Sequence, residues 1–351
     1  MTTPQKIELQ CPIPLSEYPT VQLAHGGGGT LMNQLIQKMF LSVFDNPILS
    51  QKSDAALLSL PGNKIAFTTD SFVVSPLFFP GGDIGSLAVH GTVNDLSTSG
   101  ARPLYLSVGL VLEEGFSMES LWKIILSLKQ AADDTEVYIV TGDTKVVQRG
   151  KGDGIFINTT GIGIIEHDRK IDPQSIRPGD MLVINGDIGR HGMAIMTARE
   201  ELGFKGRIES DSAALNHIVQ ALLDSHISVH CMRDLTRGGL ASALNELAAT
   251  AKFSFEIDEA RIPVDPKVQA LCEVLGIDPL HVANEGRMVF IIPEEDIANA
   301  LKIMRKLPHG QNAVCVGRVL DDDSGKVFVK SQIGARRILA MLSGEQLPRI
   351  C

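Results

Sequence analysis

Two patterns of apolar residues alternate along most of the chain. Short apolar runs predict buried strands, and segments with apolar residues three or four positions apart predict amphipathic helices. Because the two patterns alternate in both halves, the sequence predicts an α/β protein. The predicted strands cover residues 64–69, 104–112, 137–140, 155–165, 181–185, 253–257, 288–292 and 313–319, and the predicted helices cover residues 31–44, 84–96, 117–132, 191–202, 213–223, 240–251, 266–275, 294–306 and 334–342.

The length of 351 residues suggests about two domains. A polar stretch at 167–179 contains Pro173 and Pro178, and we place the domain boundary there. We therefore expect a lead-in at residues 1–20, a first domain at 21–168, a second domain at 169–343 and a tail at 344–351.

The composition indicates a globular protein of the cytoplasm. Apolar residues make up 44% and charged residues 21%, and the formal net charge of −9 argues against binding to nucleic acid or to an anionic membrane. The sequence contains no apolar run of membrane-spanning length, and its start lacks the apolar core of a signal peptide. An odd number of cysteines in a reducing compartment is best interpreted as free thiols; they are Cys11, Cys231, Cys272, Cys315 and Cys351.

Four consecutive glycines follow His25. Their backbone N–H groups either cradle a phosphate or belong to a flexible linker. The sequence matches neither the Walker A loop nor the dinucleotide fingerprint, so neither common nucleotide fold is indicated. The candidate phosphate loop consists of His25, Gly26, Gly27, Gly28 and Gly29.

Five aspartates are expected where a strand or helix meets a loop. Carboxylates without a nearby His/Cys cluster suit a hard cation, above all Mg²⁺, and together with the glycine loop they indicate a magnesium–nucleotide complex. The alternative is that each aspartate caps a helix or stabilises a turn. The five are Asp54, Asp70, Asp95, Asp143 and Asp234.

Several other charged residues are candidates for chemistry. Lys145 follows an expected turn at 141–144, where it either stabilises a transferring phosphoryl group or is an ordinary surface lysine. Arg233 and Arg237 stand beside two glycines at an expected helix start, a position that suits phosphate. Glu285 precedes a buried strand and is either a base, a lysine partner or a solvated charge.

The chain ends on Cys351. The segment before it is expected to be a short helix at 334–342, followed by seven extended residues that can reach roughly 23 Å. Cys351 is therefore either an incidental thiol on a frayed terminus or a reactive thiol that can enter a cleft. A prenylation box is excluded, because its cysteine lies fourth from the end.

From about His25 to the end, the chain resembles the HypE family of hydrogenase maturation proteins, which is related to aminoimidazole ribonucleotide synthetase, selenophosphate synthetase and thiamine-phosphate kinase. The terminal motif is highly specific within this superfamily. The likeness is carried, in the family's order, by residues 68–71, 78–85, 91–96, 141–147, 156–161, 233–234, 284–286 and Pro348-Arg349-Ile350-Cys351.

The resemblance implies two mixed-sheet α/β (α+β) domains of the aminoimidazole ribonucleotide synthetase type. The first domain would bind ATP and form a homodimer. In the family, the terminal cysteine receives a carbamoyl group from the carbamoyltransferase HypF. ATP-dependent dehydration converts the thiocarbamate to a thiocyanate, and the cyano group passes to iron on a HypC–HypD complex.

The resemblance also assigns roles to residues. Cys351 would carry the carbamoyl group, Lys145 would stabilise charge, and Glu285 would transfer or position a proton. The metal ligands would be Asp54, Asp70, Asp95 and Asp234, and the nucleotide would be held by His25–Gly29, Asn94, Gly142, Asp143, Thr144 and Arg237.

Two alternatives follow from the same residues. An enzyme that phosphorylates a small molecule, as in selenophosphate synthesis, would carry a reactive Cys or Sec beside its glycine loop, whereas this loop carries His25. An ATP-gated docking protein would bind a partner through its tail without steady ADP release.

Overall fold

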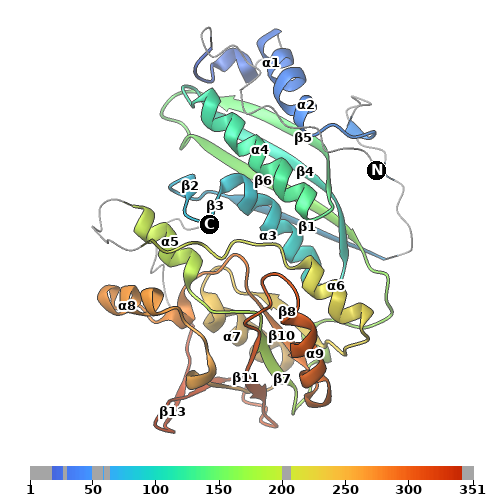
Figure 1. The fold of residues 1–351 in the computed structure, drawn as a ribbon, viewed down its shortest axis with the longest axis vertical. Helices are drawn as coiled ribbons and strands as arrows, with labels where there is room; N and C mark the ends of the chain where they lie inside the picture. The colour runs from blue at the N-terminus through green and yellow to red at the C-terminus, as the bar shows by residue number, and fades with distance from the viewer. Residues whose placement is uncertain (1–17, 27–29, 50–57, 59–63, 200–206, 342–351) are drawn as a thin grey trace.

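The computed structural model describes residues 18–26, 30–49, 58, 64–199 and 207–341. These residues form two separate mixed sheets, each with helices packed against it (Figure 1). The expectation of two α/β units, each with its own sheet, is confirmed. The exact boundaries at 168/169 and 343/344 stay predictions.

The first sheet has the strand order β1-β6-β4-β5. Strand β6 pairs antiparallel with both β1 and β4, whereas β4 and β5 are parallel. Helices α3 and α4 pack on one face of this sheet (Figure 1). The elements of this half are β1 (Ile65–Phe72), β2 (Phe78–Phe79), β3 (Gly82–Asp83), α3 (Ile84–Thr98), β4 (Arg102–Glu113), α4 (Met118–Asp134), β5 (Tyr138–Val147) and β6 (Ile155–Ile164).

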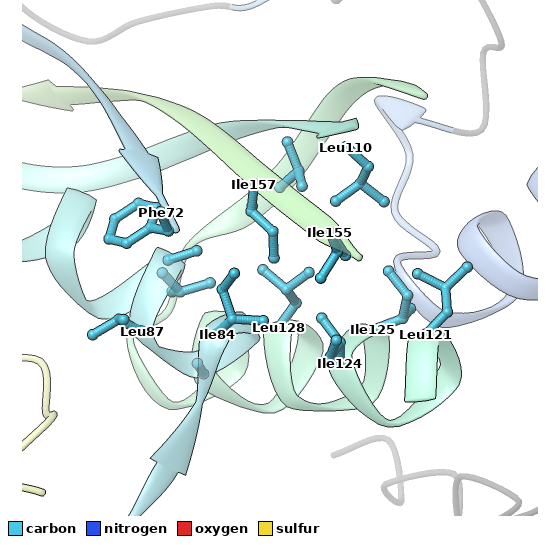
Figure 2. Packing of buried hydrophobic residues seen from close by; sticks show 14 of the residues in the cluster. Phe72, Ile84, Leu87, Leu110, Leu121, Ile124, Ile125, Leu128, Ile155 and Ile157 are labelled. Carbon is cyan, nitrogen blue, oxygen red and sulfur yellow. The ribbon is translucent and has the colours of Figure 1, made fainter. Parts of the chain in front are cut away.

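The first core lies between this sheet and its two helices. Figure 2 shows Ile155 and Ile157 of β6 meeting Ile84 of α3 and Leu128 of α4. Asp83 starts α3 with a capping box, because its carboxylate accepts from the backbone nitrogens of Gly85 and Ser86. This cap fixes the start of α3 at Ile84, where the apolar pattern predicts the helix to begin.

A short helical segment packs beside strand β5. It is continuous along the predicted helix 31–44, but its middle turn is π-helical. Its parts are the 3-10 turn η1 (Leu23–Gly26), α1 (Thr30–Leu35), the π-helical turn Ile36–Phe40 and α2 (Leu41–Val43).

The second sheet has the order β13-β12-β9-β11-β7-β10-β8. Its helical elements are α5 (Arg190–Ala198), α6 (Asn216–Asp224), α7 (Gly239–Ala251), α8 (Pro266–Leu275), α9 (Ile297–Met304) and the short 3-10 turns at Pro173–Ser175, Glu259–Arg261, Pro279–His281 and Glu294–Asp296. Its strands are β7 (Met181–Ile184), β8 (Cys231–Asp234), β9 (Phe255–Asp258), β10 (Met288–Ile292), β11 (Val314–Val319), β12 (Val327–Lys330) and β13 (Arg336–Ile338).

The prediction of a helix at 334–342 is wrong for those of its residues that the structure describes. Residues 331–335 form a tight turn in which Gly334 has a φ of +83° and donates to the backbone oxygen of Ser331. The turn reverses the chain, so that Arg336–Ile338 pairs antiparallel with β12 as strand β13. The apolar spacing therefore belongs to a hairpin, and strands β8 and β12 were not predicted either.

The aspartates expected at element ends lie mostly inside elements. Asp70 is inside β1 and Asp143 inside β5, because cross-strand pairing extends both strands beyond their apolar runs. Asp95 lies within α3, and of the four aspartates that the structure describes only Asp234 ends its strand. Lys145 likewise belongs to β5 rather than following a turn.

Candidate functional site

Three of the predicted aspartates line one cleft between the two halves of the molecule. Asp70 comes from β1, Asp95 from α3 and Asp234 from the end of β8. Asp70 faces α3 because strand residues alternate between faces, and Thr68, two positions earlier, donates to Asp95 at 3.1 Å. The cleft has a volume of about 650 Å³. A cleft of this volume at the edge of the sheet has room for a ligand of nucleotide size.

The three carboxylates repel one another when they are ionised. Burial, together with the nearby charges of Asp234 and Asp70, raises the pKa of Asp95 to about 6, although the hydrogen bond from Thr68 opposes the shift. Burial also raises the pKa of Asp70 and of Asp234. A cation placed among these groups would remove this repulsion.

The donor chemistry of the cleft fits Mg²⁺. Carboxylate oxygens are the ligands that Mg²⁺ prefers, and it usually keeps water and phosphate oxygens as its other ligands. Within the described ranges, no group of three or more His, Cys, Asp or Glu residues converges tightly enough to hold a metal ion by itself. A magnesium ion here would therefore need further ligands from a nucleotide or water. Asp54, the fourth predicted metal ligand, lies outside the described residues.

Arginines supply positive charge at the same cleft. Arg237 lies on its rim, and its guanidinium opposes the rise in the pKa of Asp70. Arg233 forms an ion pair with Glu246 at 2.5 Å and a weaker one with Asp234 at 3.9 Å. Arg237 therefore remains the better candidate for contact with phosphate.

A second group of predicted residues lies on strand β5. Asp143 and Lys145 are two positions apart on one face and form an exposed ion pair of 3.2 Å. Thr144 points to the opposite face and is buried. A Cβ atom at Gly142 would lie 2.5 Å from the backbone oxygen of Val108, so glycine is required for the close approach of β4.

A small pocket separates β5 from the short helical segment. It has a volume of about 140 Å³, its walls include Met32 and Ile36, and its rim includes Gly142, Asp143 and Thr144. This mixture of apolar wall and polar rim suits a planar heterocycle.

The candidate phosphate loop begins beside Tyr18, whose ring contacts that of His25. His25 is buried, burial lowers its pKa, and its Nδ1 accepts from the backbone nitrogen of Gln22 at 3.0 Å. Gly26 ends the turn η1, and Gly27, Gly28 and Gly29 lie outside the described residues. His25 thus anchors the start of the loop.

The structure does not bring the two groups of residues together within one chain. Strands β6 and β4 lie between β1 and β5, which separates the edges by roughly 14 Å. Asp70 faces the helices, whereas Lys145 shares the outer face with its neighbour Val111. Lys145 therefore points away from the aspartate cleft.

Glu285 and Asn94 meet at the junction of the two halves. Both side chains are buried, and the Nδ2 of Asn94 lies 3.4 Å from the backbone oxygen of Glu285. Asn94 also donates to the backbone oxygen of Ala213 and accepts from the backbone nitrogen of Leu215. These contacts engage the amide of Asn94 inside the protein, although it was predicted to bind the nucleotide.

Sequence reasoning missed Asp211 and Thr68. Thr68 belongs to the matched segment 68–71 and alternates with Asp70 along a strand, but neither signal predicted a role for it. Asp211 stands in a polar trio before an apolar segment and resembles a local helix cap, yet its partners lie 20 to 75 positions away in sequence. Cys351 lies outside the described residues.

Comparison with known proteins identifies the family. Two family models match, "AIR synthase related protein, N-terminal domain" over residues 52–165 and "AIR synthase related protein, C-terminal domain" over residues 177–330. The chain is 49% identical to "Carbamoyl dehydratase HypE" of Rhodobacter capsulatus over 333 residues, which cover 94% of this chain and 98% of the relative. The chain belongs to the HypE family of carbamoyl dehydratases.

Solved HypE structures share the fold. "Hydrogenase Maturation Protein HypE in complex with ATP" superimposes with a TM-score of 0.91 at 47% identity, covering 95% of this chain and 100% of that one. A HypE chain from a "HypE-HypF complex" gives a TM-score of 0.77 at 44% identity, covering 88% and 99%. The two mixed-sheet domains expected from the family resemblance are thereby confirmed.

Proposed function

We propose that this carbamoyl dehydratase uses ATP to convert an S-carbamoyl group on its own Cys351 into a thiocyanate, for the cyanide ligands of [NiFe] hydrogenase. Membership of the HypE family supports the dehydration, and a relative of nearly the same fold was solved with ATP. The observation that carries the proposal is the cleft in which Asp70, Asp95 and Asp234 gather charge suited to a magnesium nucleotide. The sulfur of Cys351 would carry the carbamoyl group throughout the reaction.

The reaction balances in two steps. The carbamoyl oxygen attacks the γ-phosphorus of ATP, so that an O–P bond forms, the bond from ADP to that phosphorus breaks and one N–H proton is lost. Phosphate then leaves with the former carbamoyl oxygen as the second N–H proton is removed, and C≡N forms. The products are the thiocyanate, ADP, phosphate and a proton, because phosphorylation turns a poor leaving group into a good one.

Each residue is assigned a role in binding or catalysis according to its position. Mg²⁺ would be held by Asp70, Asp95 and Asp234 together with Asp54, and when bound it would neutralise charge on the phosphates. Arg237 and the loop His25–Gly29 would bind the phosphates. Glu285 would take or position the N–H proton, and Lys145 would stabilise developing charge. The remaining contacts with the nucleotide are assigned to Gly142, Asp143 and Thr144, whereas the amide of Asn94 is already bound within the protein.

A homodimer would reunite the two groups of site residues. Part of the outer face of the first sheet is apolar and exposed among the described residues, since Phe67 is 67% exposed, Tyr138 56% and Ile65 53%. Pairing two copies through this face would bury that surface and place Lys145 of one protomer near the edge strand β1 of the other. We therefore propose that the site is completed across the dimer.

The partners follow from the reaction. The carbamoyl group would come from HypF, and a HypE relative was solved in complex with HypF. The cyano group would pass to iron on a HypC–HypD complex. A cytoplasmic location fits the free thiols of Cys231, Cys272 and Cys315. Among the described residues, no helix has the length and apolarity to cross a membrane.

The test is the intact mass of the C-terminal peptide. The protein is incubated with HypF, a carbamoyl source and Mg-ATP, and the peptide should first gain a carbamoyl group and then lose one water. Cys351→Ala should show neither change, whereas Cys315→Ala should behave like the wild type. A carbamoylated peptide that retains its water while ATP is cleaved would overturn the proposal.

A further inference from the structure

Asp211 is a buried carboxylate that no part of the proposed reaction uses. Its side chain is 7% exposed and accepts three backbone hydrogen bonds. One oxygen accepts from the nitrogen of His191 at 2.9 Å, and the other accepts from Glu285 at 3.2 Å and Gly286 at 2.9 Å. A single carboxylate thus joins the start of helix α5 to the backbone that carries Glu285.

The helix end explains why a carboxylate is needed. Gly189 precedes α5 and provides no side-chain cap. Asp211 supplies that cap from a distant segment, and its negative charge is favourable at a helix N-terminus. Asparagine cannot replace it fully, since one of its two polar atoms is a donor that would face a backbone N–H.

The backbone at Glu285 has little freedom to move. A Cβ atom at Gly286 would lie 1.9 Å from the backbone oxygen of Asp211, so only glycine fits. The backbone oxygen of Glu285 accepts from the nitrogen of Ala213 at 3.4 Å. The segment that contains Asp211 therefore holds this peptide on both sides.

The same segment is fixed to the first domain. Ser210 donates from its backbone nitrogen to the oxygen of Pro80 at 2.8 Å, and Ser212 hydrogen-bonds His90 of α3 at 3.1 Å. Helix α3 also carries Asp95 of the cleft. Asp211 consequently has a defined position relative to both Glu285 and the aspartate cleft.

We propose that Asp211 is a positioning residue for the dehydration, which sets the place of the Glu285 carboxylate through its two backbone hydrogen bonds. The inference rests on the proposed function of Glu285. Asp211→Asn should lower the single-turnover rate of water loss from the carbamoylated peptide by about 10- to 100-fold, because a displacement near 1 Å has an effect of this size. The Kd for Mg-ATP should stay within about twofold.

A double-variant cycle separates positioning from general damage. If Asp211 acts through Glu285, Asp211→Asn combined with Glu285→Gln should be no slower than Glu285→Gln alone. Asp180→Asn is the matched control. Asp180 is also buried and accepts a backbone N–H, from Arg177 at 2.7 Å, but it lies at the other end of β7. The control should lower thermal stability and leave the rate unchanged.

The outcomes are distinct. Full activity of Glu285→Gln would refute the proposed role of Glu285 itself. Three other results would overturn only the positioning role of Asp211. The first is a slow Glu285→Gln variant with a fast Asp211→Asn variant, and the second is a double variant whose effects are additive. The third is an Asp180→Asn variant as slow as Asp211→Asn. Should Asp211→Asn not fold, Asp211→Ser gives the same test, because its hydroxyl can still cap α5. Failure of both variants to fold would also overturn the proposal.

Discussion

The side-chain Nδ2 of Asn94 donates a hydrogen bond to the backbone oxygen of Ala213 over 2.9 Å, which joins helix α3 to the second half of the chain. The same amide accepts from the backbone nitrogen of Leu215 at 2.8 Å. Asp95, the next residue, faces the cleft. One turn of α3 therefore binds the second domain and carries a proposed metal ligand.

Asn94→Ala should destabilise the protein by about 2–4 kcal/mol, because it leaves a buried donor and a buried acceptor without partners. The free energy of unfolding is measured with urea. Asn158 is an exposed residue of β6, so Asn158→Ala is the control and should change stability little. Equal stability of Asn94→Ala and the wild type would show that the junction does not depend on this amide.

Asp70→Asn and Asp95→Asn should each weaken Mg-ATP binding and abolish ATP cleavage, since an amide lacks the charge that a hard cation requires. Because these carboxylates repel one another, the metal-free variants should be at least as stable as the wild type at neutral pH. Calorimetry measures the affinity, and the exposed Asp133→Asn is the control. An unchanged affinity in both variants would remove these residues from the site.

His90 should make the protein sensitive to acid. Burial, aided by His309, lowers its pKa to about 4, below the ordinary value of 6.5. The stabilising contribution of neutral His90 is therefore fully present above pH 6.5 and is lost as the pH falls toward 4. The loss is at most about 3 kcal/mol, and smaller to the extent that solvent reaches the ring.

Urea unfolding at pH 7 and pH 4.5 measures this effect. His90→Gln cannot gain a proton, so its stability should fall less between the two pH values than that of the wild type. His217 is exposed on α6, and His217→Gln should keep the wild-type difference. A difference of the same size in His90→Gln would assign the acid sensitivity to other groups.

The sequence predicted the elements of the first sheet well and its site only in part. Apolar residues placed α3 and α4 correctly, since α4 buries one clear face on the sheet and α3 is buried on nearly all sides. It could not show that β1 and β5 are opposite edges, since strand order depends on pairing between distant segments. The sequence therefore could not predict the distance between Asp70 and Lys145. It also could not predict the hydrogen bond from Glu285 to Asp211, which are 74 residues apart in sequence.

A mixed dimer tests whether the site is shared. Lys145→Ala and Asp70→Asn should each be inactive alone. If each site uses Lys145 of one protomer and Asp70 of the other, random mixing of the two variants restores both groups at about a quarter of all sites. The measurement is water loss from the carbamoylated peptide after the variants are mixed and dimers exchange.

A control mixture establishes the baseline. Asp70→Asn mixed with Asp95→Asn should remain inactive, because both residues belong to the same cleft and are supplied by the same protomer. No recovery in the first mixture, with proven exchange of protomers, would place Lys145 and Asp70 in one protomer's site or outside the site altogether.

The terminal position of Cys351 should itself matter for dehydration. Appending two residues after Cys351 should stop water loss although the thiol is still present, because a chain that enters end-first needs space only for its last side chain and carboxylate. Extra residues would displace the sulfur, and a shift near 1 Å costs about 100-fold in rate.

Electrostatics acts in the opposite direction, since moving the carboxylate away from the sulfur should lower the pKa of the thiol and make it more nucleophilic. Wild-type and extended proteins are therefore carbamoylated chemically to equal extent before Mg-ATP is added, which removes thiol reactivity from the comparison. Equal rates of water loss, followed by mass spectrometry, would mean that the terminal position is incidental and that end-first entry is wrong.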